Sequence, residues 1–280
     1  MKKKIIRIIL FLLALFMCIP IFFIISGSLM GQAELEEYLK AILTEGSGYV
    51  TWSLIPMYPT LRSIVELLLD SPEFFVMFWN SIKIVAYILF GQAIISIPAA
   101  WAFSQYKIPF KKILFTLYIV LMLMPFQVTM LSSYLVLDKF KMIDTQLSLI
   151  MPAIFSTFPI FIMYRFFDNI PKSYIEAARV DGASEFKIFM KIGIPLGKPG
   201  IISALILNFI EYWNMIEQPL IFIKSKSKWP LSLFLPNVSM SNVSLAFIAS
   251  LVTMTTSLII FFAGQKYLKQ GIISIGRKEQ

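Results

Sequence analysis

Side chains able to do chemistry are rare in the apolar parts of this sequence, and most of them lie in a single block. On a helical period of 3.6 residues, Glu211, Asn214 and Gln218 share a narrow stripe. Glu217 lies about 120° from Glu211 on the same wheel, and Lys83 lies inside another apolar block. Charged groups at the depth of a bilayer cost about 2.5–3.5 kcal/mol even on a lenient insertion scale, so they should face a cavity or a partner. We predict that the stripe lines a substrate path and that Lys83 neutralises one of the two glutamates.

A second interpretation of the stripe is an internal polar contact between helices that has no access to substrate. Pro219 lies in the same block, and a proline there can distort the helix and shift the angles on which the stripe depends. The sequence alone leaves these two interpretations nearly balanced.

Composition excludes several other kinds of site. The chain has one cysteine, Cys18, and no histidine, which excludes an intrachain disulfide, thiol or imidazole metal sites and histidine-based catalysis. HExxH and GxSxG motifs are absent, so an intramembrane enzyme is not expected. The fragment nearest to a GxxxxGK[ST] nucleotide loop, Gly193–Lys198, has only three residues between its glycines. We expect no catalytic residue, no metal and no cofactor, with any ATP bound by a partner.

A helix–glycine–helix pattern in residues 167–199 forms a second candidate site. Ser173 followed three residues later by Glu176 is a capping-box pattern, which predicts a helix start there. Gly182 is placed to end this helix, because glycine adopts positive φ without steric cost.

An apolar face follows the glycine. Phe186, Phe189 and Met190 stand at spacings i, i+3 and i+4, which brings them together on one side of a helix. An aromatic face in a polar segment needs a surface that buries it. Either a separate protein or the chain's own spans could provide that surface.

Long apolar blocks dominate the 280 residues, of which 58% are hydrophobic, and the mean hydropathy is +0.78. About 20 apolar residues span the core of a bilayer, where only helices or closed barrels satisfy the backbone. Bundled membrane helices tolerate prolines as kinks. Four prolines inside or at the ends of the blocks therefore do not argue against spanning helices: Pro98, Pro125, Pro152 and Pro159. The sequence predicts an all-α membrane protein with six transmembrane helices. The six blocks are residues 5–25, 75–103, 113–135, 147–166, 201–222 and 243–262.

Lysine and arginine fall mainly on one side of this topology. Of the 25 basic residues, 17 lie at the two termini and in the second and fourth connections. An excess of positive charge marks the cytoplasmic side, so both termini are predicted to be cytoplasmic. The net charge of +9 therefore reports topology, and nucleic acid is not expected as a partner.

No repeat or linker divides the chain, so we expect a single transmembrane domain over residues 1–280, with its core at 72–270 and the polar loop at 167–199. The first block is longer than the apolar core of a signal peptide and is predicted to stay as an uncleaved helix. Residues 28–72 form the largest external segment, which closes with an amphipathic stretch at 60–69. This segment is either a solvated loop with one short helix or a docking surface for an external partner.

One motif in the polar loop has a recognisable spacing. Glu176-Ala177-Ala178 is followed after three residues by Gly182, and after nine more by Ile192-Gly193-Ile194-Pro195. This pattern resembles the EAA loop of ABC-importer permeases, with Ile194 where leucine is usual. The flanks, from about residue 72 to the end, are similar to the maltose-permease type of carbohydrate permease. The flanking matches are Asn80-Ser81, Pro125-Phe126-Gln127, Arg165-Phe166-Phe167, Ile170-Pro171, Asp181-Gly182-Ala183, Trp213-Asn214 and residues 265–271.

This resemblance implies a type I ABC importer permease-like fold and a role in carbohydrate import across the bacterial cytoplasmic (inner) membrane. It implies a heterodimer with a second permease subunit, a cytoplasmic ABC ATPase dimer that binds the loop, and an extracytoplasmic solute-binding protein that delivers the sugar. Residues 215–219 depart from the family's apolar pattern, which weakens any transfer of a substrate from relatives. The residues that the resemblance assigns to ATPase coupling are Glu176, Ala177, Ala178, Asp181, Gly182, Phe186, Phe189 and Pro195.

Three other functions stay open on sequence alone. One is an ABC permease for a solute that is not a sugar. Another is a secondary transporter driven by an ion gradient, for which Glu211, Glu217 and Lys83 could supply a charged relay. The small number of spans and the polar loop argue against that carrier. A scaffold or receptor is the third.

Overall fold

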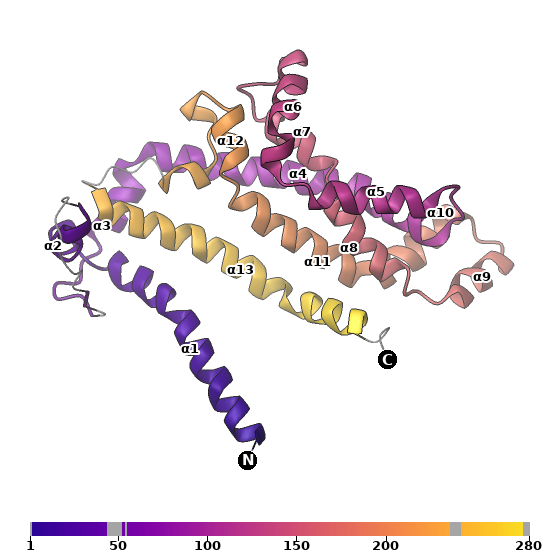
Figure 1. Ribbon diagram of the computed structural model, residues 1–280, viewed down its shortest axis with the longest axis horizontal. Helices are drawn as coiled ribbons and strands as arrows, with labels where there is room; N and C mark the ends of the chain where they lie inside the picture. Colours follow the sequence, from indigo (N-terminus) through magenta and orange to yellow (C-terminus); the bar gives the residue numbers. More distant parts are fainter. Residues whose placement is uncertain (1, 44–51, 54, 236–241, 277–280) are drawn as a thin grey trace. The chain divides into compact units, whose positions relative to one another are not determined.

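The computed structural model describes residues 2–43, 52–53, 55–235 and 242–276 (Figure 1). Helices make up its regular structure, and this described part contains no β-strand. It divides into two compact units, unit 1 (Met1–Phe78 with Leu233–Thr256) and unit 2 (Trp79–Ser232 with Ser257–Gln280). The expectation of a single domain stays a prediction.

In chain order the helices are α1 (Lys2–Ser28), α2 (Gln32–Leu43), α3 (Arg62–Val65), η1 (Glu66–Asp70), α4 (Pro72–Gln105), α5 (Lys111–Leu123), α6 (Phe126–Lys139), α7 (Leu147–Ile154), α8 (Phe158–Phe167), α9 (Lys172–Val180), α10 (Glu185–Ile188), η2 (Phe189–Gly193), α11 (Ile194–Trp213), α12 (Glu217–Phe222), η3 (Lys226–Lys228), η4 (Leu231–Leu233) and α13 (Val243–Gly276).

Within the described ranges, five helices are long and apolar enough to cross a membrane, and a bent pair makes a sixth span. The helical fold with six candidate spans confirms the predicted fold class. The five are Lys4–Ser28, Pro72–Gln105, Leu147–Phe167, Glu185–Trp213 and Val243–Gln270, and the bent pair is Lys111–Leu123 with Phe126–Lys139.

The third predicted span is not one straight helix. Helices α5 and α6 meet at an angle of 99°. The cause is local: Met124 has φ −72° and ψ 121°, an extended conformation that a residue before proline prefers. Pro125 also lacks the backbone N–H that would continue the helix. The kink expected at this proline is a sharp corner.

The fifth predicted span differs at both ends. Its helix begins at Glu185, because the π-turn η2 joins α10 to α11 without a break. Its far end is interrupted, since α11 stops at Trp213 and α12 starts at Glu217. Pro219 lies in the first turn of α12, where its missing N–H costs nothing, whereas an uninterrupted helix would bring its ring against a preceding carbonyl. The single wheel over 201–222 is therefore wrong.

Unit 1 contains α1, the segment 28–72 that was predicted to be external, and the first half of α13. The Phe23 and Trp52 rings stack with centroids 3.8 Å apart, and Phe247 of α13 lies 5.7 Å from Trp52. The amphipathic stretch predicted at 60–69 forms a short helix, α3 followed by η1. Side chains of residues 4–20 in α1 are exposed within the chain, which suits a helix surrounded by lipid or by another subunit.

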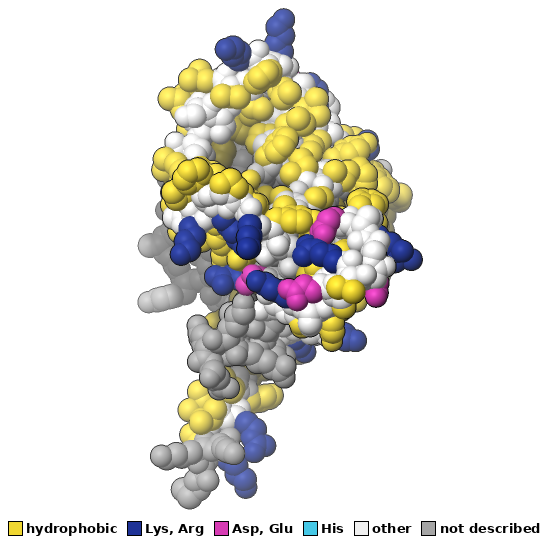
Figure 2. All heavy atoms as spheres, turned by 90° about the vertical axis from the view of Figure 1, so that its right-hand side faces the viewer, with side chains coloured by type: hydrophobic (Ala, Val, Ile, Leu, Met, Phe, Trp, Pro, Cys, Tyr) yellow, Lys and Arg dark blue, Asp and Glu magenta, His cyan; other side chains and the backbone are white. Residues whose placement is uncertain are grey.

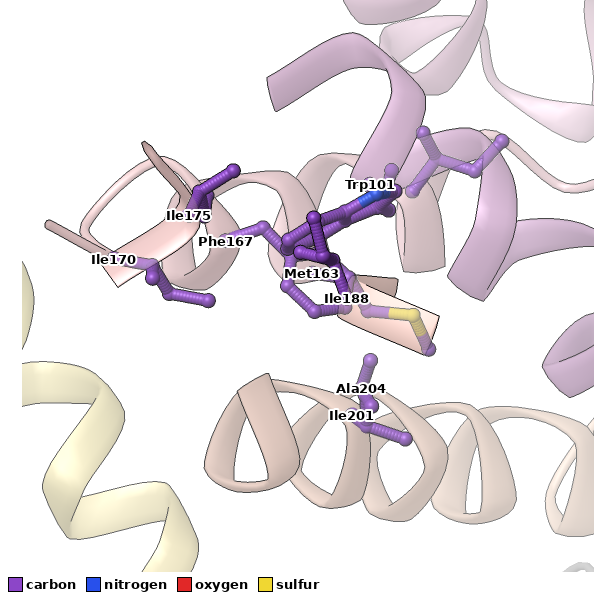
Figure 3. Close-up of a cluster of buried hydrophobic side chains, with 10 residues drawn as sticks. Trp101, Met163, Phe167, Ile170, Ile175, Ile188, Ile201 and Ala204 are labelled. Atoms are coloured by element: carbon purple, nitrogen blue, oxygen red, sulfur yellow. The ribbon is translucent and has the colours of Figure 1, made fainter. Parts of the chain in front are cut away.

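The core of unit 2 is the close contact between α8 and α11. A Cβ added at Gly197 would overlap the Phe167 ring, and one at Gly200 would overlap Phe166. The absence of side chains at these glycines lets the two helices approach closely. Buried side chains of α4, α8 and α11 fill the space around this contact (Figure 3), among them Trp101 and Ile201.

Candidate functional site

The polar loop begins with α9, which starts one residue before the predicted Ser173 cap. Pro171 occupies the N-cap position with ψ 127°, and no side chain caps the helix. The predicted capping box is therefore wrong, although the predicted helix is present. The reason is that Pro171 already supplies the extended backbone that precedes a helix, so Ser173 lies inside the first turn.

Gly182 ends α9 as predicted. Its φ is +77°, and two backbone bonds close the turn: Gly182 N–H donates to the Arg179 carbonyl and Ala183 N–H to the Ala178 carbonyl, both at 3.0 Å. This pair of bonds is the Schellman motif, in which the residue after the helix adopts the left-handed conformation. Ser184 then begins α10, its side chain accepting a hydrogen bond from the Lys187 N–H at 3.3 Å.

Two buried isoleucines anchor the loop to the spans. Ile175 of α9 and Ile188 of α10 belong to the same apolar cluster as Trp101 and Phe167 (Figure 3). The Phe189 ring is half-buried against Trp101, with centroids 5.8 Å apart. Phe189 therefore packs against the chain's own spans, whereas the sequence pattern placed it on a shared face with Phe186.

Several apolar side chains of the loop are exposed to solvent within the chain. Val180 is 88% exposed, Phe186 72% and Tyr174 56%. Figure 2 shows the face that carries α9 and α10, where apolar side chains lie among Lys and Arg side chains and a few acidic ones. We call Tyr174, Val180, Phe186 and Met190 the outer surface of the loop. Of the other predicted coupling residues, Glu176, Ala177, Asp181, Gly182 and Pro195 are exposed and Ala178 is half-buried.

A clasp of three side chains, which the sequence did not reveal, fixes the two helices of the loop. The Arg179 guanidinium donates to both oxygens of the Glu185 carboxylate, at 2.7 and 3.1 Å. The Tyr106 hydroxyl, beyond the end of α4, donates to Glu185 at 2.9 Å. Hydrogen bonding to Glu185 raises the pKa of the Arg179 guanidinium, and burial, followed by the bond to Glu185, raises the pKa of the Tyr106 phenol. Arg179 and Glu185 face each other across the glycine turn and not along one helix, so helical spacing gave no signal.

Replacing Glu185 with alanine should loosen the turn. Arg179 and Glu185 are nearly half exposed, so the pair stabilises the turn only modestly. The amides of Gly182 and Ala183 should therefore exchange hydrogen faster, by up to about fivefold, measured by mass spectrometry. Lys187→Ala, at an exposed neighbouring position, is the control and should leave exchange unchanged. Equal exchange in the two variants would contradict a role for the clasp.

A cavity of about 480 Å³ lies between the α5–α6 corner, the α7–α8 junction and the α11–α12 break. Of the predicted stripe, Glu211 and Gln218 line this cavity. Asn214 does not line it; its amide donates to the Ile210 carbonyl at 2.7 Å, at the end of α11. The sequence did not single out its other polar lining residues, which are Thr129, Ser133, Ser148, Ser156, Thr157 and Tyr212.

Lys83 was predicted to neutralise Glu211 or Glu217, but it pairs with neither in the described chain. Glu217 accepts a hydrogen bond from the Gln127 amide at 2.6 Å. Lys83 is exposed, and the ion pairs of the described chain include none between Lys83 and Glu211 or Glu217. The predicted neutralisation by Lys83 is therefore absent. That pairing was predicted from the similar depth of Lys83 and the glutamates in the membrane, and a shared depth does not by itself bring the ammonium within ion-pair distance of a carboxylate.

The Asn80-Ser81 motif has a structural role in unit 2. The Asn80 amide donates to the carbonyls of Ser227 and Trp229 at 2.9 and 3.1 Å, and the Ser81 hydroxyl accepts from the Leu231 N–H at 2.7 Å. These bonds tie α4 to the segment that follows α12.

Asp144 holds the start of that segment. Its carboxylate accepts from the Ser225 N–H and hydroxyl at 2.8 and 2.6 Å and from the Lys224 N–H at 3.0 Å. The Ser225 bonds, ahead of those from Lys224 and Lys228, hold the pKa of Asp144 well below its usual range. Asp144 thus ties the α6–α7 connection to residues 224–228.

The sequence of this chain is similar to those of known membrane transport proteins. The model of the family described as binding-protein-dependent transport system inner membrane component matches residues 92–274. A probable ABC transporter permease protein of Pyrococcus horikoshii is 31% identical over 229 residues, which is 79% of this chain and 83% of the relative. An arabinooligosaccharides transport system permease protein of Halalkalibacterium halodurans is 25% identical over 82% of this chain and 83% of its own length.

Among solved structures, a bacterial ABC transporter involved in the import of the acidic polysaccharide alginate has the same fold. The TM-score is 0.77 at 22% identity, over 95% of each chain.

Proposed function

The chain belongs to the family of binding-protein-dependent transport system inner membrane components, and we propose that it is one permease subunit of an ATP-binding cassette importer for an oligosaccharide. It is a multi-pass membrane transporter subunit and not an enzyme. The family name itself implies a binding protein. A partner permease and a separate ATPase belong to the same general arrangement.

The observation that carries the proposal is the outer surface of the loop. Phe186 and Val180 are exposed on a segment whose inner side chains, Ile175 and Ile188, are buried. A segment that is anchored on one side and apolar on the other is built to be covered by a second protein. We infer that this protein is the ATPase, and that the Glu176–Pro195 loop couples ATP hydrolysis to movement of the spans.

The arrangement in the membrane follows from the distribution of charge. The loop and both termini carry most of the lysine and arginine residues, which supports a cytoplasmic position for all three in a bacterial inner membrane. The external segment 28–72 would then face the solute-binding protein.

An oligosaccharide is the proposed cargo, because the relative from Halalkalibacterium halodurans is named for arabinooligosaccharides. We assign the cavity beside Glu211 and Gln218 to a section of the path, since carboxylate, amide and hydroxyl groups can bind sugar hydroxyls.

Reconstitution tests this function directly. The chain, its partner permease and its ATPase in proteoliposomes should take up labelled oligosaccharide only when ATP and the binding protein are both present. Ionophores that collapse ion gradients should have no effect. Uptake that follows the ion gradient and ignores ATP would identify a secondary transporter instead, the carrier that Glu211, Glu217 and Lys83 could serve.

The heterodimer can be tested separately by expression. Six spans are too few to surround a substrate path, and most of the α1 surface is exposed within the chain. Both features call for a second permease subunit. Without its partner permease, the chain should be degraded or inactive, as measured by membrane immunoblot and uptake. ATP-driven uptake by this chain and an ATPase alone would replace the heterodimer with a homodimer and leave the importer assignment intact.

A further inference from the structure

The charge balance of the cavity points to the kind of saccharide that it accepts. Of the 19 residues that line it, Glu211 alone is charged, and none is lysine or arginine. The remaining polar groups are the Gln218 amide, the Tyr212 phenol and the hydroxyls of five serines and threonines. An anion entering this space would meet a carboxylate and no cation among the cavity's own residues.

Glu211 has no hydrogen-bond or ion-pair partner among the residues that the structure describes, although it lies in a membrane span. The neighbouring polar groups are engaged elsewhere: Asn214 donates to a backbone carbonyl, and Glu217 accepts from Gln127. An ionised carboxylate only accepts hydrogen bonds. Glu211 is exposed, so hydroxyl or amide donors of an occupant of the cavity can reach its carboxylate.

We propose that Glu211 makes this cavity a site for uncharged, hydroxyl-rich saccharides and disfavours saccharides that carry carboxylates, sulfates or phosphates. The proposal rests on the importer function and specifies its substrate class. At an effective dielectric constant of about 20, a second negative charge about 8 Å away would be disfavoured roughly thirtyfold. This chain thereby differs from the importer of the acidic polysaccharide alginate, whose fold it shares.

Charged thiol reagents measure this selection without knowledge of the natural cargo. In the assembled complex with Cys18→Ser, Gln218→Cys should react faster with a cationic methanethiosulfonate (trimethylammonioethyl) than with an anionic one (sulfonatoethyl). Glu211→Gln should reduce this preference about tenfold or more, and Glu211→Asp, which keeps the charge, should retain it. Phe140→Cys, at a 65% exposed position beyond the end of α6 and outside the outer surface of the loop, is the control, and its preference should not respond to Glu211→Gln. An unchanged preference at position 218 in Glu211→Gln would overturn the proposal.

Saccharide protection tests the class of cargo. Arabinotriose, xylotriose and maltotriose are the neutral probes, and trigalacturonate and a mannuronate trimer are the acidic ones. In the Gln218→Cys complex, at least one neutral trisaccharide should slow labelling at position 218, the acidic trimers should not, and Glu211→Gln should admit the acidic trimers. Protection by an acidic trimer with Glu211 intact, or by no neutral one, would overturn the saccharide class. ATP-driven, binding-protein-dependent uptake in the same preparation would leave the importer function standing in either case.

Discussion

Replacing Phe186 with aspartate should abolish binding of the ATPase while the chain stays folded in the membrane. Phe186 is 72% exposed within the chain, so its loss costs the isolated subunit little. In the complex, burying a phenylalanine contributes about 1.5–3 kcal/mol, and a buried unpaired carboxylate adds a further penalty. The combined loss of about 4 kcal/mol corresponds to roughly a thousandfold weaker binding. Co-purification of the ATPase from solubilised membranes measures it.

The matched control is another exposed phenylalanine at a different place in the same unit. Phe140 follows α6 and is 65% exposed, and α6 lies away from α9 and α10 (Figure 1). Phe140→Asp should leave ATPase binding at the level of the unmodified chain. If Phe186→Asp still co-purifies with the ATPase and supports uptake, the outer surface of the loop is not the docking surface.

Replacing Gly182 with valine should separate ATP hydrolysis from transport. The position has φ +77°, and a Cβ there would meet nothing within 4 Å. The penalty is therefore one of backbone conformation, about 1–2 kcal/mol, and larger for a β-branched residue. The turn should open, α9 and α10 should lose their fixed angle, and uptake per ATP hydrolysed should fall at least tenfold in proteoliposomes.

Gly182→Asn distinguishes backbone strain from loss of a contact. Asparagine adopts the left-handed conformation more readily than other residues with a side chain, and open space surrounds the position. This variant should keep most of the coupling. Equal loss in both variants would show that the side chain, and not φ, is the problem, for example by blocking the ATPase itself.

The sequence predicted the parts of this fold that depend on hydrophobic length and on single residues with unusual backbone freedom. Six apolar blocks became six candidate spans because a bilayer demands about 20 apolar residues per helix. Gly182 was placed correctly because few residues other than glycine favour positive φ. Glu211 and Gln218 reached the same cavity although the helix between them is interrupted.

The features that the sequence did not predict depend on how one helix joins the next and on contacts between residues that are far apart in the sequence. The extended backbone before Pro125 bends a span by 99°, and proline near a block edge can give either a kink or a corner. Phe189 packs against Trp101 of α4, a residue 88 positions away, so no helical period within the loop contains this contact. The Glu185 clasp joins residues 6 and 79 positions apart, which no local pattern contains.

The unbroken helix from Glu185 to Trp213 has a mechanical consequence. It runs for 29 residues, or about 43 Å at 1.5 Å per residue, from the clasped loop to the cavity. Its tight contact with α8 at Gly197 lies about 18 Å from one end and about 24 Å from the other. If the helix pivoted there as a rigid rod, a 3 Å displacement of α10 would swing the part beside Glu211 by about 3.5 Å in the opposite direction. In that case the wall of the cavity would move in the opposite direction to the loop.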